Sequence, residues 1–412
     1  MKFRSCILTC VFVALICGPF FIYLAEKTDI ALPSWMTAED ASYLSGDASH
    51  ADVKASLSID GFASGALQEV IEKSVGNRIP FKATAMLTNA ELQREFIAAS
   101  NLLFNWSCYP AFYGSTLSVD PSAQRLFDAP LKLNDVTLAP YREVATALEE
   151  SAAHHDASQF YLYFAPDNQI VSGAPLGALV SDYASYEDIL QVFLDTDGKI
   201  RIVDGDVSYN NFQDMWYKTD HHWNIFGAYD AYKRIASAMD LPALTDEETN
   251  FFEYQSPKFY GSLARQALDG DLSDELSDFT FRNNPPLTVT INSSKRGGEE
   301  LLVHRDDYQA SDWSKQKFAS RYGEYFHSDY GLIEIDNPSI TSASELLIVA
   351  DSYSNCIERL FALDFSKIYV LDPRHTNEKL DSFLDEHPDI DKVLFLMRKN
   401  NLSSEQTLDV LS

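Results

Sequence analysis

The chain has 412 residues, of which 46% are hydrophobic, so it is long enough for one large domain or two ordinary domains with buried cores. Its 61 acidic residues outnumber its 32 basic residues and give a formal net charge of -29. This composition excludes a wholly disordered chain. It also argues against a nucleic-acid-binding role, because no run of lysine and arginine offsets the negative charge.

The N-terminus predicts a membrane anchor. Lys2 and Arg4 precede an uncharged segment over residues 5–25, whose 21 residues are enough to span a bilayer. The alternative is a cleaved signal peptide, but its apolar region is usually shorter, and Tyr23 stands where a cleavage site needs a small residue. Basic residues before the span and acidic residues after it predict that the rest of the chain lies outside the cytoplasm.

The residues after this segment suggest three parts. We predict a transmembrane anchor over residues 1–27, a stalk rich in Ser, Ala and Asp over residues 28–62, and one folded domain over residues 63–412. Only Cys108 and Cys356 of the five cysteines lie beyond the anchor. This number excludes a disulfide scaffold, and leaves open whether the two pair or are buried free thiols.

Helices are predicted at the start of the domain and strands in its middle. Apolar residues at helical spacing favour a helix over residues 64–77, and a capping-box pattern at Thr88 and Glu91 favours a second helix that ends near Leu103. Aromatic and β-branched residues predict strands over residues 160–164 and 200–204.

The stretch YKTDHHWNIFGAYDAY, residues 217–232, places Asp220, His221 and His222 in a loop. Apolar residues then recur at helical intervals, and Asn224 is suited to be the N-cap of that helix. The three polar side chains therefore stand just before a helix.

The last hundred residues have the rhythm strand, helix, strand, helix, strand. ELLIVAD, KIYVLD and KVLFLM are the predicted strands, separated by a helix over residues 354–362 and a second helix in NEKLDSFLDEH. This rhythm indicates parallel βαβ units, so we predict an α/β fold whose parallel sheet is covered by helices on both faces.

Ser352 follows ELLIVAD and so lies where the carboxyl end of a strand meets a helix. Sites in α/β sheets form at this edge, and amides at the start of a helix would stabilise an oxyanion. The alternative is that Asp351, Ser352 or Ser354 only caps the helix.

A nucleophilic serine needs a histidine base and a carboxylate that orients the imidazole. Residues two apart in an extended loop face the same way, so Asp220 can support His222, while His221 points elsewhere. A metal site at these residues would need a further ligand nearby, and the sequence offers neither HExxH nor CxxC. We therefore expect no metal.

Four motifs in a fixed order resemble a known family. KTDHHWNIFGAYDAY, then KFYGSL at residues 258–263, then LLIVADSYSN and IYVLDPRH are similar to the DHHW family, relatives of the alginate O-acetyltransferase proteins in the SGNH-hydrolase-like superfamily. The resemblance implies a three-layer α/β/α domain in which the Asp-x-His element precedes the serine. It also implies a catalytic triad of Asp220, His222 and Ser352.

The resemblance also implies an activity. An O-acetyltransferase of this type moves an acetyl group to hydroxyls of an exported or cell-surface polysaccharide through an acyl-serine, without a bound cofactor. A membrane-bound O-acyltransferase partner would supply the acyl group, and the anchor would keep the domain at the membrane. The alternatives are an acetyl esterase with the same triad and a non-catalytic glycan-binding or assembly protein.

Further residues at strand ends are candidates for contacts with the substrate or the oxyanion. Arg374 follows one predicted strand, Asn400 and Asn401 follow another, and Tyr260 lies in the KFYGSL motif. A structural role is the alternative for each.

Overall fold

The computed structural model describes most of the chain after residue 81. The described residues are 82–412 without 197, 243, 245–247, 311–317, 319–321, 328 and 342–343, together with 13, 17, 18, 21, 25, 28 and 30. The predicted stalk and the predicted helix over residues 64–77 lie outside the described part, except for residues 28 and 30, and so does most of the predicted anchor. None of the helices built from described residues has the length and apolar character that a membrane crossing needs.

The chain divides into two compact units. The first comprises Met1–Phe104, Ala264–Asp271 and Gln316–Ala319, and the second comprises the remaining residues from Asn105 onwards. Within the first unit, α5 (Lys82–Phe104) is fixed by Arg94, whose guanidinium donates to the carbonyls of Ala267 at 3.3 Å and Leu268 at 2.8 Å. The predicted N-cap at Thr88 is wrong, because the helix starts at Lys82 and Thr88 lies inside it.

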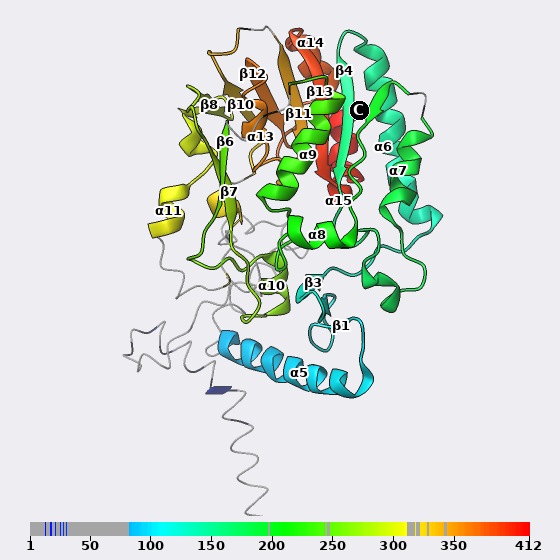
Figure 1. Ribbon diagram of the computed structural model, residues 1–412, viewed down its shortest axis with the longest axis vertical. Helices are drawn as coiled ribbons and strands as arrows, with labels where there is room; N and C mark the ends of the chain where they lie inside the picture. The colour runs from blue at the N-terminus through cyan, green and yellow to red at the C-terminus, as the bar shows by residue number, and fades with distance from the viewer. Residues whose placement is uncertain are drawn as a thin grey trace, which may run out of the picture. The chain divides into compact units, whose positions relative to one another are not determined.

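An eight-stranded sheet forms the centre of the second unit, with the strand order β5-β4-β13-β11-β12-β10-β8-β9. The first five strands of this order, from β5 at the edge to β12, are parallel to one another, as the βαβ rhythm predicts. The sheet is not parallel throughout, however, since β10, β8 and β9 pair antiparallel at one edge, which the rhythm of the last hundred residues does not predict. The fold is thus mixed α/β with a large central sheet (Figure 1).

The bounds of the other elements follow. The strands are β1 (Tyr109–Pro110), β2 (Ser118–Asp120), β3 (Arg125–Phe127), β4 (Gln159–Ala165), β5 (Ile200–Ile202), β6 (Thr249–Glu253), β7 (Ser277–Phe281), β8 (Thr288–Ile291), β9 (Lys295–Gly297), β10 (Leu332–Asp336), β11 (Glu345–Ala350), β12 (Lys367–Leu371) and β13 (Ile390–Arg398). The α-helices are α6 (Asp135–His154), α7 (Tyr186–Leu194), α8 (Tyr209–Met215), α9 (Ile225–Ala238), α10 (Ser262–Ala267), α11 (Arg305–Ala310), α12 (Tyr322–Tyr325), α13 (Glu358–Phe361), α14 (Leu380–Glu386), α15 (Lys399–Leu402) and α16 (Glu405–Leu411). Two short 3-10 helices are η2 (Pro175–Ala178) and η3 (Glu299–Leu301).

Helices cover both faces of the sheet because successive side chains of a strand point to opposite sides (Figure 1). Leu346 and Ile348 of β11 pack into a core that includes α9, while Leu347 and Val349 pack into a second core with α6, α7, α14 and α16. This burial on both sides explains why β4 and β11 are almost continuously apolar.

Most predicted elements of the second unit are confirmed. The strands β4, β5, β11, β12 and β13 and the helix α14 form where the sequence predicts them. Asn224 is the N-cap of α9, since its side chain accepts hydrogen bonds from the amides of Phe226 and Gly227. Cys108 and Cys356 are buried free thiols.

The predicted helix over residues 354–362 is wrong at its start. Only Glu358–Phe361 is helical, and the residues before it form a series of turns. The carboxylate of Asp351 accepts a hydrogen bond from the Tyr353 amide at 2.9 Å, and its carbonyl accepts one from the Ser354 amide. These bonds hold the chain in a turn instead of a helical start.

Candidate active site

Asp220, His221 and His222 are held in a tight loop just before α9. Trp216 and Trp223 face each other in an isolated antiparallel bridge, and the amide of Tyr217 donates to the carbonyl of His222 at 3.2 Å. This backbone closure and the N-cap at Asn224 fix both ends of the loop, so its polar side chains have little freedom.

The carboxylate of Asp220 accepts three hydrogen bonds. One oxygen, Oδ1, lies 2.6 Å from Nδ1 of His222 and 3.0 Å from the amide of the same residue. The other oxygen, Oδ2, accepts from the amide of Ser262 at 2.6 Å. Nδ1 of His222 therefore carries the ring proton, and Nε2 is left with a lone pair that can accept a proton.

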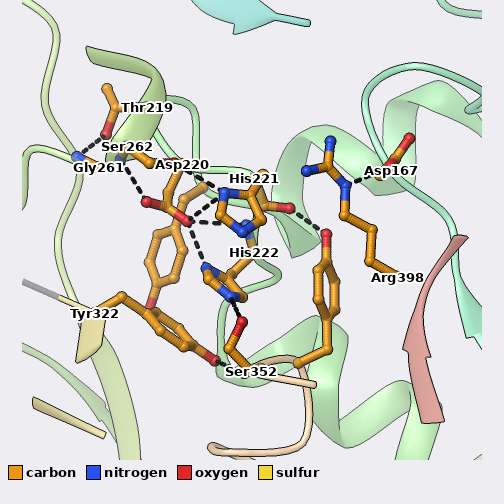
Figure 2. A network of polar contacts seen from close by, with 12 residues as sticks. Asp167, Thr219, Asp220, His221, His222, Gly261, Ser262, Tyr322, Ser352 and Arg398 are labelled. Carbon is orange, nitrogen blue, oxygen red and sulfur yellow. Dashed lines mark hydrogen bonds and ion pairs between the residues drawn. The ribbon is translucent and has the colours of Figure 1, made fainter. Parts of the chain in front are cut away.

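Nε2 of His222 lies 2.8 Å from Oγ of Ser352, although the two residues are 130 positions apart in the sequence. Ser352 stands just beyond β11, whose two neighbours, β12 and β13, both follow it in the chain and lie on opposite sides of it. This is the point of an α/β sheet where sites are expected. Figure 2 shows the continuous path from Asp220 through His222 to Ser352.

The turn that carries Ser352 is fixed by Asp351. Besides the Tyr353 amide, its carboxylate accepts from the amide of Arg398 at 2.9 Å and from Nδ2 of Asn401 at 2.6 Å. Arg398 at the end of β13 and Asn401 just after it therefore fix the turn at the end of β11 that carries Ser352. The predicted oxyanion site of helical amides is wrong, because no helix begins at this turn and the amide of Tyr353 is already bonded.

Gly261 allows the loop that contains Ser262 to approach Asp220. A Cβ at position 261 would lie 2.4 Å from Cβ of Asp220 and 2.4 Å from the carbonyl oxygen of Thr219. The Gly261 amide donates to Oγ1 of Thr219 at 3.0 Å, beside the bond from Ser262 to Asp220 (Figure 2). Only a residue without a side chain fits this distance.

Tyr322 packs against the imidazole of His222. The two rings are 3.7 Å apart and 2° from parallel, and the Tyr322 hydroxyl donates to the carbonyl of Ser352 at 3.3 Å. This side chain therefore contacts both the histidine and the serine (Figure 2). Its role was not predicted, since no spacing or motif distinguishes it among the 21 tyrosines of the sequence.

Burial raises the pKa of Asp220, but the neighbouring imidazoles and the hydrogen bonds from His222 and Ser262 outweigh it and hold this pKa well below its usual range. The prediction that His221 points away from Asp220 and His222 is wrong, because its Nδ1 lies 3.6 Å from Oδ1 of Asp220. Burial and the neighbouring His222 lower the pKa of His221 well below its usual value. At neutral pH the site therefore contains a carboxylate beside a neutral His221.

The remaining predicted residues do not all reach this site. Arg374 is held by two acidic residues, with bonds of 2.6 and 2.9 Å to Asp372 and an ion pair of 3.1 Å to Asp329. Asn401 supports Asp351, and the exposed Asn400 accepts from Lys399 at 2.8 Å. No bond from these three residues to Ser352 or His222 is found among the described residues.

Two further features complete the surroundings. Tyr260 precedes Gly261 in the loop that contacts Asp220, which places it close to that contact along the chain. Arg398, at the end of β13, is bound to Asp167 at 2.7 Å and Asp128 at 2.8 Å, so two carboxylates balance its charge together with that of buried Lys399.

The group Asp220, His221 and His222 has the composition of a metal site. However, Nδ1 and Nε2 of His222 are both in hydrogen bonds, and so are both carboxylate oxygens of Asp220. A cation bound here would have to break the contact between Asp220 and His222. The ring nitrogens of His222 and the carboxylate oxygens of Asp220 are therefore better suited to the hydrogen bonds that they make than to binding a metal ion.

The fold and the site define a class of protein: a mixed α/β chain that brings a serine, a histidine and an aspartate into hydrogen-bonding succession at the carboxyl end of a parallel strand. Residues 191–371 match the model of the family described as DHHW protein, which confirms the resemblance to the DHHW family predicted from the motifs.

Solved structures share this fold. The structure of Bacillus cereus PatB1 with a sulfonyl adduct has a TM-score of 0.57 and 18% identity, over 71% of this chain and 98% of that chain. A DHHW family protein from Eubacterium siraeum has a TM-score of 0.56 and 17% identity, over 72% of this chain and 94% of that chain. No curated protein matches the sequence.

Proposed function

We propose that this protein is an extracytoplasmic O-acetyltransferase with an SGNH-hydrolase-like catalytic domain, which moves an acetyl group to hydroxyls of a polysaccharide. The observation that carries the proposal is the hydrogen-bonded path from Asp220 to His222, at 2.6 Å, and from His222 to Ser352, at 2.8 Å. Both distances lie within the range that an activated serine requires. A protein that only bound a glycan would not need this arrangement.

In the proposed reaction Oγ of Ser352 attacks the acyl carbonyl while Nε2 of His222 takes the serine proton. His222 then returns the proton to the leaving group, and an acyl-serine is formed. Asp220 keeps the proton of the ring on Nδ1 and stabilises the imidazolium that forms. In the second half, a sugar hydroxyl gives its proton to His222 and attacks the acyl-serine, so the acyl group moves to the sugar oxygen and Ser352 recovers its proton.

The comparisons support covalent chemistry of this kind. Sulfonyl reagents react with activated nucleophiles, and the structure of Bacillus cereus PatB1, which shares the fold, contains a sulfonyl adduct. The family match covers Asp220, His222 and Ser352 together.

The cellular setting is also part of the proposal. We infer that the segment over residues 1–27 anchors the domain outside the cytoplasm, and that a membrane-bound O-acyltransferase delivers the acyl group. The donor is then a partner protein, and the domain needs no resident cofactor or metal for the steps above.

The test is Ser352→Ala in the organism that makes the protein. We expect glycan acetylation to be lost at normal protein levels, whereas Ser181→Ala, at an exposed serine, leaves it intact. Unchanged acetylation in Ser352→Ala would end the proposal. The purified protein with an activated acetyl ester and an oligosaccharide tests the second half, since an esterase with the same triad would release only free acetate.

A further inference from the structure

His221 lies beside the base but is more accessible. The centroids of the two imidazole rings are 4.0 Å apart. The side chain of His221 is 25% exposed, whereas that of His222 is 6% exposed. Of the two histidines, His221 is therefore the one that an incoming molecule can touch.

The surroundings of His221 decide which ring nitrogen carries the proton. Nδ1 lies 2.8 Å from Oγ of Ser262 and 3.6 Å from Oδ1 of Asp220. A carboxylate at this distance favours the proton on Nδ1, which then donates to Ser262. Because burial lowers the pKa of His221 and keeps the ring neutral, Nε2 retains a lone pair and can accept a hydrogen bond.

The backbone and the ring of His221 are fixed. The hydroxyl of Tyr353 donates to the carbonyl of His221, and Ser262 holds Nδ1. Among the residues that the structure describes, none bonds to Nε2 of His221. The side chain thus presents a preoriented acceptor beside the catalytic base (Figure 2).

Building on the proposed function, we propose that His221 binds the acyl acceptor: its Nε2 accepts a hydrogen bond from the hydroxyl next to the one that is acylated. The attacking hydroxyl itself is not the partner of His221, because its single proton must pass to Nε2 of His222. The preferred acceptor therefore carries two neighbouring hydroxyls, as sugar rings do, and a lone alcohol lacks the second contact.

In this step the attacking oxygen forms a bond to the acyl carbon as its proton moves to Nε2 of His222. The bond between that carbon and Oγ of Ser352 breaks, and His222 passes the proton to Oγ. The neighbouring hydroxyl keeps its own proton throughout and donates it in a hydrogen bond to Nε2 of His221. His221 therefore positions the acceptor without exchanging a proton.

The experiment compares two acceptors that differ only in the second hydroxyl. Purified protein with p-nitrophenyl acetate is given cis-1,2-cyclohexanediol or cyclohexanol, and the acetylated acceptor is measured relative to free acetate. We expect the wild type to favour the diol about fivefold, which is the effect of one net hydrogen bond. His221→Phe keeps an aromatic ring but no acceptor, and should lose this preference, whereas His221→Gln should restore part of it.

Ser262→Ala is the control that tests whether His221 has only a structural role. It removes the hydroxyl that holds Nδ1 but keeps the amide that bonds to Asp220. If His221→Phe and Ser262→Ala lowered all products equally and left the preference for the diol unchanged, the inference would be wrong. No preference in the wild type would also overturn it. Product formation that persists unchanged in Ser352→Ala would instead refute the proposed function, and with it this inference.

Discussion

At the scale of single residues, Asp220 receives three N–H donors on two oxygens. An asparagine has only one oxygen to offer, so it cannot satisfy the amide of Ser262 on one side and the ring of His222 on the other. The carboxylate thus determines the tautomer of His222 as well as its orientation.

We therefore predict that Asp220→Asn lowers acetyl transfer by about 10³–10⁴-fold while the protein stays folded, because the amide nitrogen would face Nδ1 and move the ring proton to Nε2. Transfer from an activated acetyl ester measures the effect, and circular dichroism checks the fold. A variant that keeps most of the wild-type rate would show that the tautomer does not limit the reaction.

At the scale of elements, the site depends on the close approach of two loops, one ending at α9 and one ending at α10. Thr219 and Gly261 touch through backbone and hydroxyl groups, and a Cβ added to Gly261 would lie only 2.4 Å from atoms of Thr219 and Asp220. The geometry of Asp220 thus depends on a residue that has no side chain.

Gly261→Ala should lower the free energy of unfolding by about 1–3 kcal/mol, because the added methyl group must displace Asp220 or the carbonyl of Thr219. Activity should fall with it. Gly323→Ala is the matched control, since nothing lies within 4 Å of its added Cβ. Equal thermal melting temperatures for the two variants would contradict this account.

A second link between elements joins α9 to the turn after α13. The hydroxyl of Tyr232 donates to Asp364 at 2.5 Å, and burial raises the pKa of this aspartate to about 6 in spite of that bond. Because the folded pKa is above the unfolded value, the folded protein binds the proton more tightly. Asp364 therefore costs stability as the pH rises from about 4 to 6.

Asp364→Asn keeps an acceptor for Tyr232 and removes the charge. Its gain in unfolding free energy should be near zero at about pH 4 and reach about 1–2 kcal/mol at about pH 7.5, after allowance for the partial exposure of the group. Urea unfolding at the two pH values measures this difference, with Asp156→Asn at an exposed position as the control. A difference that does not change with pH would contradict the assignment.

At the scale of the whole molecule, the net charge of -29 makes self-repulsion a general cost of folding. Buried ion pairs such as Arg359 with Asp278, both 0% exposed, are little affected by salt, whereas the exposed carboxylates are screened. Because acidic residues are in excess, the screening of repulsion between exposed carboxylates should dominate the effect of salt on stability.

We therefore expect the melting temperature to rise by a few degrees between about 10 and 300 mM sodium chloride, because the Debye length becomes shorter than the spacing between exposed charges. The rise should exceed that produced by sucrose of equal osmolality. A melting temperature that falls with salt would show that attractive ion pairs dominate the stability of this chain.

The parts of the fold that were predicted are those whose signal is local. Strands such as β4 and β11 are continuous apolar runs, and Asn224 has the position of an N-cap before an amphipathic helix. The antiparallel edge of β10, β8 and β9 could not be predicted in the same way, because its pairing partners are set by tertiary contacts.

The site was predictable to the extent that its chemistry needs particular residue types. Asp220, His222 and Ser352 stand in motifs, and the structure brings them together. Tyr322 and Ser262 act through packing and a backbone amide, which leave no pattern in the sequence. For Arg374 the position at a strand end was a misleading signal, because its guanidinium is paired with Asp329 and Asp372.

The position of β11 in the sheet has a consequence for biosynthesis. Its partners on both sides, β12 and β13, are made only after it, so the strand that presents Ser352 emerges from the ribosome before either neighbour exists. His222, the base of the proposed function, is made 130 residues before Ser352, and so it is in place before the sheet can close. The contact between His222 and Ser352 therefore forms only when the chain is nearly complete. Under the proposed function, we expect a nascent or C-terminally truncated chain to show no acetyl transfer.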